Sequence, residues 1–274
     1  MSIRTEAVMG TLVTIQVAHP RPEASAAVER ALGWFYEIER RCSRFEEGSE
    51  LMQLTARPGV RVPVSAILYE AVQFAVRVAE ETGGAFDPTA GRRPAVSAAG
   101  DVSYRDVQLD PDRNTILLLR PLTLDLGAVA KGLAVDMAAR ELAPLRDFAV
   151  DAGGDLYLGG RNPQGEPWRV GIRHPRREGE LLASVRVSDQ AVCTSGDYER
   201  PHHILDPRTG VPSGGAASVT VVASGAMLAD ALATAAFVLG PDPGIQLLER
   251  MGVEGLIVTP ELERYQTRGL PDAA

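Results

Sequence analysis

The sequence has few cysteines, few aromatic residues and no long apolar run. Cys42 and Cys193 are the only cysteines among 274 residues, which excludes a disulfide framework and a cysteine-rich zinc cluster. We expect two reduced, buried thiols in a cytoplasmic protein. No apolar run approaches the roughly 18 residues of a membrane span, so no membrane insertion is expected. Residues 1–8 have neither the basic nor the apolar region of a secretory signal.

Positive charge is also scarce. The chain has 28 Lys plus Arg against 36 Asp plus Glu, a formal net charge of -8 and a sequence pI near 5.1. This balance argues against nucleic acid or an anionic membrane surface as the main partner. Hydrophobic residues make up 45% and charged residues 23%, which is typical of a globular protein and too apolar for disorder. No linker or low-complexity tract splits the chain, and we expect a single domain over residues 1–274.

Lysine is nearly absent. Lys131 is the single lysine among the 28 basic residues. An ammonium is a compact point charge that can lie beside a phosphate or a carbonyl where a guanidinium will not serve. Lys131 is therefore either a surface residue that remains lysine by chance or a residue with a functional role.

Hydrophobic spacing predicts helices that alternate with short strands. Ser65 is a plausible N-cap, and Gly83-Gly84 would stop the helix that follows it. Because several strand pairs look like hairpins, the pattern favours an α+β fold with mixed or antiparallel sheets over a doubly wound parallel sheet. The expected helices are 23–41, 65–82, 127–142, 226–239 and 244–251, and the expected strands are 12–18, 107–109, 115–119, 148–150, 168–172, 183–187, 219–223 and 255–258.

Two short windows resemble each other. Residues 86–91 (FDPTAG) share Asp-Pro and a closing Gly with residues 205–210 (LDPRTG). The likeness is consistent with an internal duplication or with two turns of the same chemistry.

Residues 125–132 (DLGAVAKG) place a glycine and the lone lysine where a strand-like run gives way to a helix. The free N–H groups of a helix start attract an anion, and Lys131, one turn in, can reach the same anion. The GxxxxGK[ST] spacing of a Walker A loop is absent. The alternative is a glycine turn with a surface lysine.

Asp230 and Thr234 interrupt a helix that is otherwise Ala, Leu and Met. A spacing of four places both side chains on one face, and a carboxylate in apolar surroundings needs a partner such as a hard cation. Alternatively, Asp230 benefits from the helix dipole and Thr234 bonds back to the previous turn.

Three further polar segments stand out. Residues 194–198 (TSGDY) precede His202-His203, two of only four histidines, and Asp206-Pro207. Adjacent residues on a strand point to opposite faces, so we expect one histidine to face a site and the other to pack. A zinc pair is disfavoured because the usual spacings are missing.

Residues 151–155 (DAGGD) form either a tight hairpin or part of a site.

Taken together, these segments resemble the ApbE family of FAD:protein FMN transferases. The matching motifs occur in the family's order and span about residues 9–240. They are 9–11 (MGT), 84–89 (GAFDPT), 125–132 (DLGAVAKG), 151–155 (DAGGD), 194–200 (TSGDYER), 202–210 (HHILDPRTG) and 218–234.

The resemblance implies a T-fold-like α+β architecture and a Mg²⁺-dependent enzyme. Such an enzyme cleaves FAD, releases AMP and attaches FMN by a phosphoester to a Thr or Ser exposed on an acceptor flavoprotein. Carried over by motif position, the metal ligands are Asp230, Thr234 and the carbonyls of Ala128 and Ala233. The residues expected to contact FAD are Met9, Phe45, Ala85, Phe86, Asp87, Asp125, Lys131 and Ile204. Lys131 would stabilise charge on the pyrophosphate, and the candidate bases for the acceptor hydroxyl are His203, His202 and Asp206.

The chain departs from the family pattern at several places. Phe45 stands where a Tyr is common, which keeps stacking and loses a hydroxyl. Thr55 replaces a common Asn, a Trp-Gly-Phe segment is absent around residues 92–100, and the interval between Tyr198 and His202 is short. Many relatives are exported lipoproteins, whereas this sequence has no lipobox cysteine.

The competing hypotheses are a Mg²⁺-dependent FAD pyrophosphatase, with water as acceptor, and a non-catalytic FAD carrier. The Asp230/Thr234 pair and Lys131 favour an enzyme.

Overall fold

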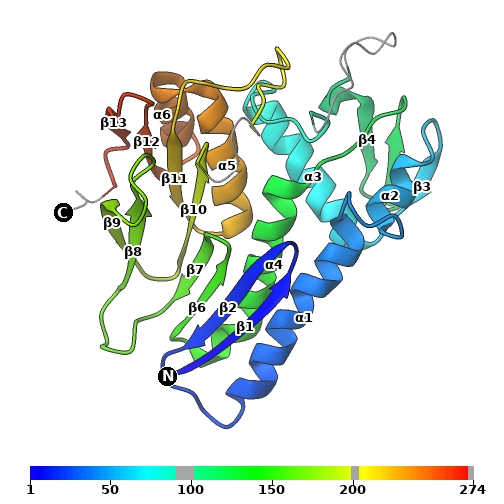
Figure 1. Cartoon of the computed structure of the whole chain (residues 1–274). Helices are drawn as coiled ribbons and strands as arrows, with labels where there is room; N and C mark the ends of the chain where they lie inside the picture. Colours follow the sequence, from blue (N-terminus) through cyan, green and yellow to red (C-terminus); the bar gives the residue numbers. More distant parts are fainter. Residues whose placement is uncertain (91–101, 199–203, 271–274) are drawn as a thin grey trace.

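The computed structural model describes residues 1–90, 102–198 and 204–270. One eight-stranded sheet runs through it, and every neighbouring pair of strands in this sheet is antiparallel (Figure 1). In spatial order the strands are β1 (Ser2–Val8), β2 (Thr11–Val17), β6 (Phe148–Ala152), β7 (Asp155–Gly159), β10 (Gln190–Gly196), β11 (Ser218–Ala223), β12 (Glu254–Val258) and β13 (Arg264–Gln266).

Helices cover one face of this sheet. Helices α4 and α5 pack against each other and on the central strands, and α1 packs on the outer side of α4 (Figure 1). The helices are α1 (Ala24–Cys42), α2 (Glu50–Thr55), α3 (Ala66–Glu81), α4 (Gly127–Leu142), α5 (Ala226–Leu239) and α6 (Pro241–Arg250), with 3₁₀ turns η1 (Tyr104–Asp106) and η2 (Ala143–Leu145).

Two small sheets complete the fold. Strands β3 (Arg61–Pro63), β5 (Thr115–Leu118) and β4 (Val107–Asp110) form one beyond α3, and the hairpin of β8 (Trp168–Arg173) and β9 (Leu181–Val187) forms the other. The hairpin covers the face of the main sheet opposite the helices.

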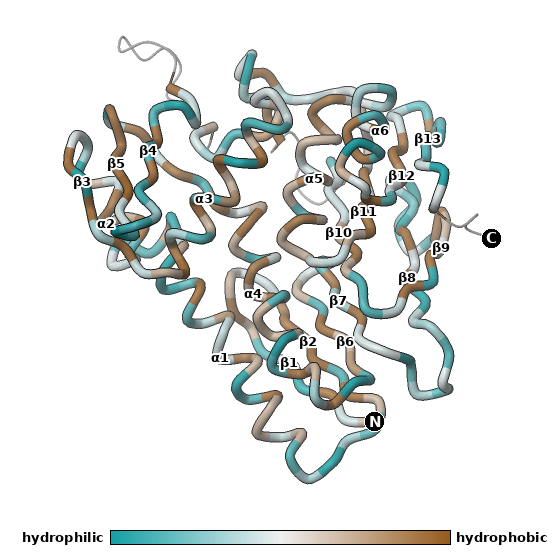
Figure 2. The backbone as a smooth tube through the Cα atoms, turned by 180° about the vertical axis from the view of Figure 1, so that it is seen from behind, coloured by the Kyte–Doolittle hydropathy of each residue, from teal (hydrophilic) through white to brown (hydrophobic). Residues whose placement is uncertain are grey.

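Successive side chains of a strand point to opposite faces of the sheet. The central strands are buried on both faces because the helices cover one face and the β8–β9 hairpin covers the other. On β10, Ala191 and Cys193 face the helices, whereas Val192 lies in a second apolar cluster with Trp168 of the hairpin. All six residues of β11 are buried. Figure 2 shows the corresponding hydrophobic colouring along β10 to β12 and α5, with hydrophilic residues concentrated in the outer turns. The sheet is thus the middle layer between two apolar cores.

The crossing of α4 and α5 depends on a glycine. A Cβ at Gly132 would lie 2.5 Å from the Cα of Met227 and 2.6 Å from the carbonyl oxygen of Ala226, so only hydrogen fits there. Asp136, one turn further along α4, accepts hydrogen bonds from the N–H groups of Ala226 (2.6 Å) and Met227 (3.0 Å). This carboxylate caps the start of α5.

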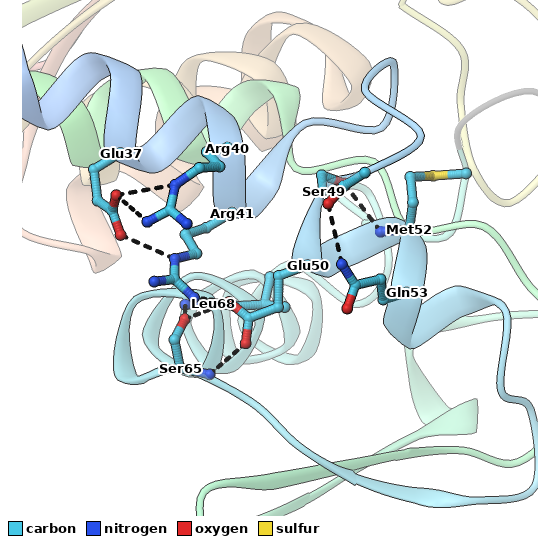
Figure 3. A network of polar contacts seen from close by, with 10 residues as sticks. Glu37, Arg40, Arg41, Ser49, Glu50, Met52, Gln53, Ser65 and Leu68 are labelled. Carbon is cyan, nitrogen blue, oxygen red and sulfur yellow. Dashed lines mark hydrogen bonds and ion pairs between the residues drawn. The ribbon is translucent and has the colours of Figure 1, made fainter.

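A polar network joins α1, α2 and α3 (Figure 3). Arg41 near the end of α1 pairs with Glu37 (2.9 Å) and Glu50 (3.0 Å), and Glu50 accepts a hydrogen bond from the hydroxyl of Ser65 (2.6 Å). Ser49, the N-cap of α2, donates to the carbonyl of Ser43 (2.6 Å). The network thereby anchors both ends of the loop between α1 and α2.

The expected α+β class with antiparallel sheets is confirmed, and each expected helix is present within a few residues. The last helix begins at Pro241 rather than at 244, because Pro suits the first turn of a helix. Five strands have no counterpart among those expected: β1, β3, β7, β10 and β13. Strand β1 is an edge strand whose mostly exposed residues have no apolar alternation. Among the described residues, no helix is long and apolar enough to cross a membrane.

Candidate active site

Lys131 and Asp155 meet between α4 and the main sheet. The Lys131 ammonium lies one turn into α4 and contacts the carboxylate of Asp155, whose side chain is 3% exposed. Asp155 is the first residue of β7 and follows Gly153 and Gly154, which turn the β6–β7 hairpin with φ of 64° and 96°. The DAGGD segment is therefore a tight hairpin that also aims a buried carboxylate at the lone lysine.

Asp230 lies near the same ammonium. Its Oδ2 atom is 3.9 Å from Lys131 Nζ and has no hydrogen-bond partner among the described residues. Burial raises the pKa of this carboxyl, and the positive charge of Lys131 opposes that rise. A buried carboxylate oxygen without a donor is costly unless a cation or a ligand meets it.

Thr234 is one turn further along α5. Its hydroxyl lies 3.3 Å from the hydroxyl of Ser195 on β10, so its described partner comes from the sheet rather than from the previous turn of the helix. The helix-dipole alternative for Asp230 also loses support, because the carboxylate of Asp136, from α4, already accepts the N–H groups at the start of α5. Burial raises the pKa of Asp136, although the two N–H groups act against this.

The start of α4 offers fewer free N–H groups than expected. The N–H of Gly127 donates to Asp125 Oδ1 (2.9 Å), and those of Val129 and Ala130 donate to the carbonyl of Leu126 (2.9 and 2.7 Å). Ala128 departs from helical geometry with φ -88° and ψ 17°. Attraction for an anion at this point therefore falls mainly to Lys131.

Asp125 connects two loops. Its carboxylate pairs with Arg44 (Nε to Oδ2, 3.1 Å), and its N–H donates to the carbonyl of Pro88 (2.6 Å). The Arg44 guanidinium stacks on the ring of Phe45 at 4.3 Å, and Phe45 is 75% exposed. An aromatic ring this exposed is available to a flat ligand.

The AFD segment is built into the loop after α3. Ala85 and Phe86 are buried, so a ligand at these two residues would meet backbone rather than side chain. Asp87 Oδ1 accepts from Thr89 N (2.8 Å) and Thr89 Oγ1 (2.7 Å), and Oδ2 accepts from Tyr104 N (3.1 Å). Asp87 therefore orders the loop through all of these contacts.

Met9 belongs to the turn between β1 and β2, with φ of 53° at Met9 and 69° at Gly10. This turn lies beside the β6–β7 turn, because a Cβ at Gly153 would meet the hydroxyl oxygen of Thr11 at 2.2 Å. Met9 is therefore at the same end of the sheet as Asp155.

Ile204 and Asp206 start the described part of the last polar segment; His202 and His203 lie outside the described residues. The carbonyl of Ile204 accepts from Ser213 N (3.0 Å). Asp206 pairs with Arg208 (Nη2 to Oδ2, 2.9 Å), which lowers the pKa of its carboxyl. A lowered pKa makes Asp206 a weak proton acceptor and leaves the two histidines as the better candidate bases.

The two Asp-Pro windows share a turn. Asp87 Oδ1 accepts from the N–H of Thr89, and Asp206 Oδ1 accepts from the N–H of Arg208 (2.9 Å), each two residues on. The two windows therefore have the same Asx turn.

The metal ligands expected from sequence do not form a cluster of acidic residues. Among the described residues, no three His, Cys, Asp or Glu side chains gather in a way that could hold a metal ion. A cation here would depend on Asp230 together with hydroxyl and carbonyl oxygens, which are ligands for a hard ion such as Mg²⁺. Ala233 adjoins Thr234 on α5, and its side chain is buried.

A cavity of about 870 Å³ lies elsewhere, around the C-terminal half of α4 and the start of α5. Asp136, Arg140, Arg146, Tyr157 and Arg161 are among its lining residues. None of the site residues expected from sequence lines it, so this cavity is separate from the polar cluster at Lys131.

Sequence reasoning missed Arg44 and Asp136, which gave no signal of their own because each acts through a partner distant in sequence. Ser195 and Asp155 lie in the TSGDY and DAGGD motifs, but nothing in their spacing connected Ser195 to Thr234 or Asp155 to Lys131, 24 residues earlier.

The comparisons with known proteins agree with one another. The model of the ApbE family matches residues 9–257. The FAD:protein FMN transferase of Treponema pallidum (strain Nichols) is 34% identical, over 98% of this chain and 87% of its own length, and that of Haemophilus influenzae is 29% identical over 78% and 72%.

Solved structures are similar as well. The crystal structure of the ApbE protein from Thermotoga maritima superposes with a TM-score of 0.88 at 29% identity, and the flavin transferase ApbE from Vibrio cholerae with 0.86 at 26% identity. Each comparison covers 97% of both chains.

Proposed function

Because the chain belongs to the ApbE family, we propose that it is an FAD:protein FMN transferase. It cleaves FAD between its two phosphates, releases AMP and joins FMN through a phosphoester to a Thr or Ser of an acceptor flavoprotein. The observation that supports catalysis is the buried Oδ2 of Asp230, which accepts no hydrogen bond among the described residues and lies 3.9 Å from the ammonium of the lone lysine.

The oxygen donors around Asp230 fit a magnesium ion. The proposed ligands are Asp230 and Thr234, with the backbone carbonyls of Ala128 and Ala233. The non-helical dihedral angles of Ala128 support a ligand role for its carbonyl. When bound, Mg²⁺ would neutralise charge on the pyrophosphate of FAD.

Lys131 acts as the second positive group. Its ammonium would lie beside the pyrophosphate and stabilise negative charge as it develops on the departing AMP. Asp155 orients this ammonium.

The reaction transfers the phosphoryl group that carries the flavin from FAD to the acceptor hydroxyl. The acceptor oxygen attacks the FMN-side phosphorus, the bond from that phosphorus to the bridging oxygen breaks, and AMP leaves with the electron pair. The hydroxyl proton passes to a base, for which His203 and His202 are the proposed candidates and Asp206 the weaker one.

The remaining proposed contacts hold the flavin nucleotide. The exposed ring of Phe45 would stack on the isoalloxazine. Asp125 and the AFD loop adjoin each other through the bond from Asp125 N to Pro88 O, which supports a shared role in binding FAD. The other proposed contacts are Met9, Ala85, Phe86, Asp87, Lys131 and Ile204.

We further propose that residues 1–274 act as one domain in the cytoplasm. One apolar core contains residues from Val8 to Ile257, which supports a single unit. Both cysteines are buried free thiols, in keeping with a reducing compartment.

The test is AMP release from FAD with Mg²⁺, with and without an acceptor domain that exposes a Thr, followed by the intact mass of that acceptor. We expect stoichiometric AMP and a mass gain of one FMN less one water. AMP without labelling would favour the pyrophosphatase, and bound FAD without AMP would favour the carrier. Asp230→Ala should abolish metal-dependent turnover, whereas Asp112→Ala, an exposed carboxylate in the β4–β5 turn, should retain it.

A further inference from the structure

One ammonium serves two buried carboxylates at unequal distances. Lys131 reaches from α4 to Asp155 on β7, which it contacts directly, and its Nζ stays 3.9 Å from Asp230 Oδ2 on α5. The two carboxylate side chains are only 3% and 11% exposed. Burial weakens solvent screening, so both carboxylates attract the ammonium strongly.

The length of the Lys131 side chain does not explain why its ammonium contacts Asp155 rather than Asp230. A lysine has three donors on a flexible four-carbon stem, so a small movement would allow the ammonium to bond to Asp230. Asp155 is the first residue of β7 and pairs with Ala152 across the β6–β7 hairpin. The Asp230 oxygen nearest the ammonium nevertheless has no hydrogen bond among the described residues.

We propose that Asp155 is a positioning residue that holds the Lys131 ammonium away from Asp230 and so keeps Asp230 open for a cation. The inference rests on the proposed function only in taking Asp230 as a metal ligand. If Lys131 bonded directly to Asp230, an incoming metal ion would have to displace it, and metal binding would weaken by the strength of that internal pair.

Metal binding without FAD tests this directly, with Mn²⁺ as the probe and electron paramagnetic resonance counting the free ion. Asp155→Asn keeps the shape of the side chain and removes its charge, so Lys131 should move to Asp230 and Mn²⁺ should bind about tenfold more weakly. The double variant K131M/D155N removes the competing ammonium as well, and Mn²⁺ binding should return to the wild-type level or exceed it. Asp155→Glu retains the charge and should bind Mn²⁺ as the wild type does.

The outcomes separate the two proposals. A wild-type protein that binds no Mn²⁺ overturns Asp230 as a metal site and with it the metal-dependent mechanism. A wild type that binds Mn²⁺ alongside an unchanged D155N overturns the positioning role. Equal loss in D155N and K131M/D155N also overturns it, because Asp155 would then act without Lys131.

Folding is checked in each variant by circular dichroism and thermal unfolding, with Asp112→Asn as the matched control. If D155N does not fold, Asp155→Ser, which also removes the charge and retains Lys131, takes its place with the same expected loss of Mn²⁺ binding. Weak Mn²⁺ binding by the folded double variant would contradict the proposal.

Discussion

The carboxylate of Asp136 accepts the N–H of Ala226, 90 positions later in the chain, at 2.6 Å. It also accepts the N–H of Met227, so one side chain of α4 satisfies two of the free donors at the start of α5. Asp230 and Thr234 follow one and two turns later on α5. The position of both side chains therefore depends on this cap.

Replacing Asp136 with Ala should lower the free energy of unfolding by about 1–2 kcal/mol, because two part-buried N–H groups lose their acceptor. Asp136→Asn retains one carbonyl oxygen and should lose less. Urea unfolding at pH 7 measures both, and AMP release should fall together with stability in the Ala variant. Equal stability of wild type and D136A would show that water replaces the cap.

Gly132→Ala should force α4 and α5 apart. The added Cβ would lie 2.5 Å from the backbone of Met227, which cannot rotate away as a flexible side chain would. We expect a loss of about 1–3 kcal/mol in unfolding free energy. The matched control is Gly33→Ala in α1, where a Cβ meets nothing within 4 Å, and here helix propensity should add up to about 1 kcal/mol. A neutral G132A would mean that the crossing is looser than described.

Phe45→Ala should raise the KM for FAD several-fold and leave folding almost unchanged. The ring is 75% exposed, so its loss should alter the unfolding free energy by less than about 0.5 kcal/mol. Phe45→Tyr keeps the stacking surface and should keep the KM. Steady-state AMP release over a range of FAD concentrations distinguishes the variants, and an unchanged KM in F45A would exclude stacking on Phe45.

Arg208→Gln should change the pH dependence of stability. The hydrogen bond from Arg208 lowers the pKa of Asp206 below its ordinary 3.8, so the pair stabilises the fold above that pH and loses its effect as pH falls through the lowered pKa. Arg208 is 46% exposed, so we expect a difference below about 1 kcal/mol at pH 7. Urea unfolding at pH 7 and pH 3 should give a larger difference between wild type and R208Q at pH 7 than at pH 3. A difference that grows in acid would contradict this assignment.

Much of the architecture could be predicted because its causes are local. Ser65 caps α3 by accepting the N–H of Leu68 (3.3 Å), and Gly83 and Gly84 end that segment with φ of 59° and 82°. These features depend on a few neighbouring residues, and so does the one-face placement of Asp230 and Thr234. Edge strand β1 escaped prediction because its exposed residues have no apolar period.

The residue types that carry chemistry are visible along the chain: a lone lysine, an Asp and a Thr one helical turn apart, and a run of motifs in one order. How these residues combine depends on the packing of the folded chain. The contact of Lys131 with Asp155 depends on where a hairpin turn lies relative to α4, and the distance of 3.9 Å from Lys131 to Asp230 depends on how α4 and α5 pack against each other. Packing between segments far apart in sequence sets these relationships, and no local spacing encodes them.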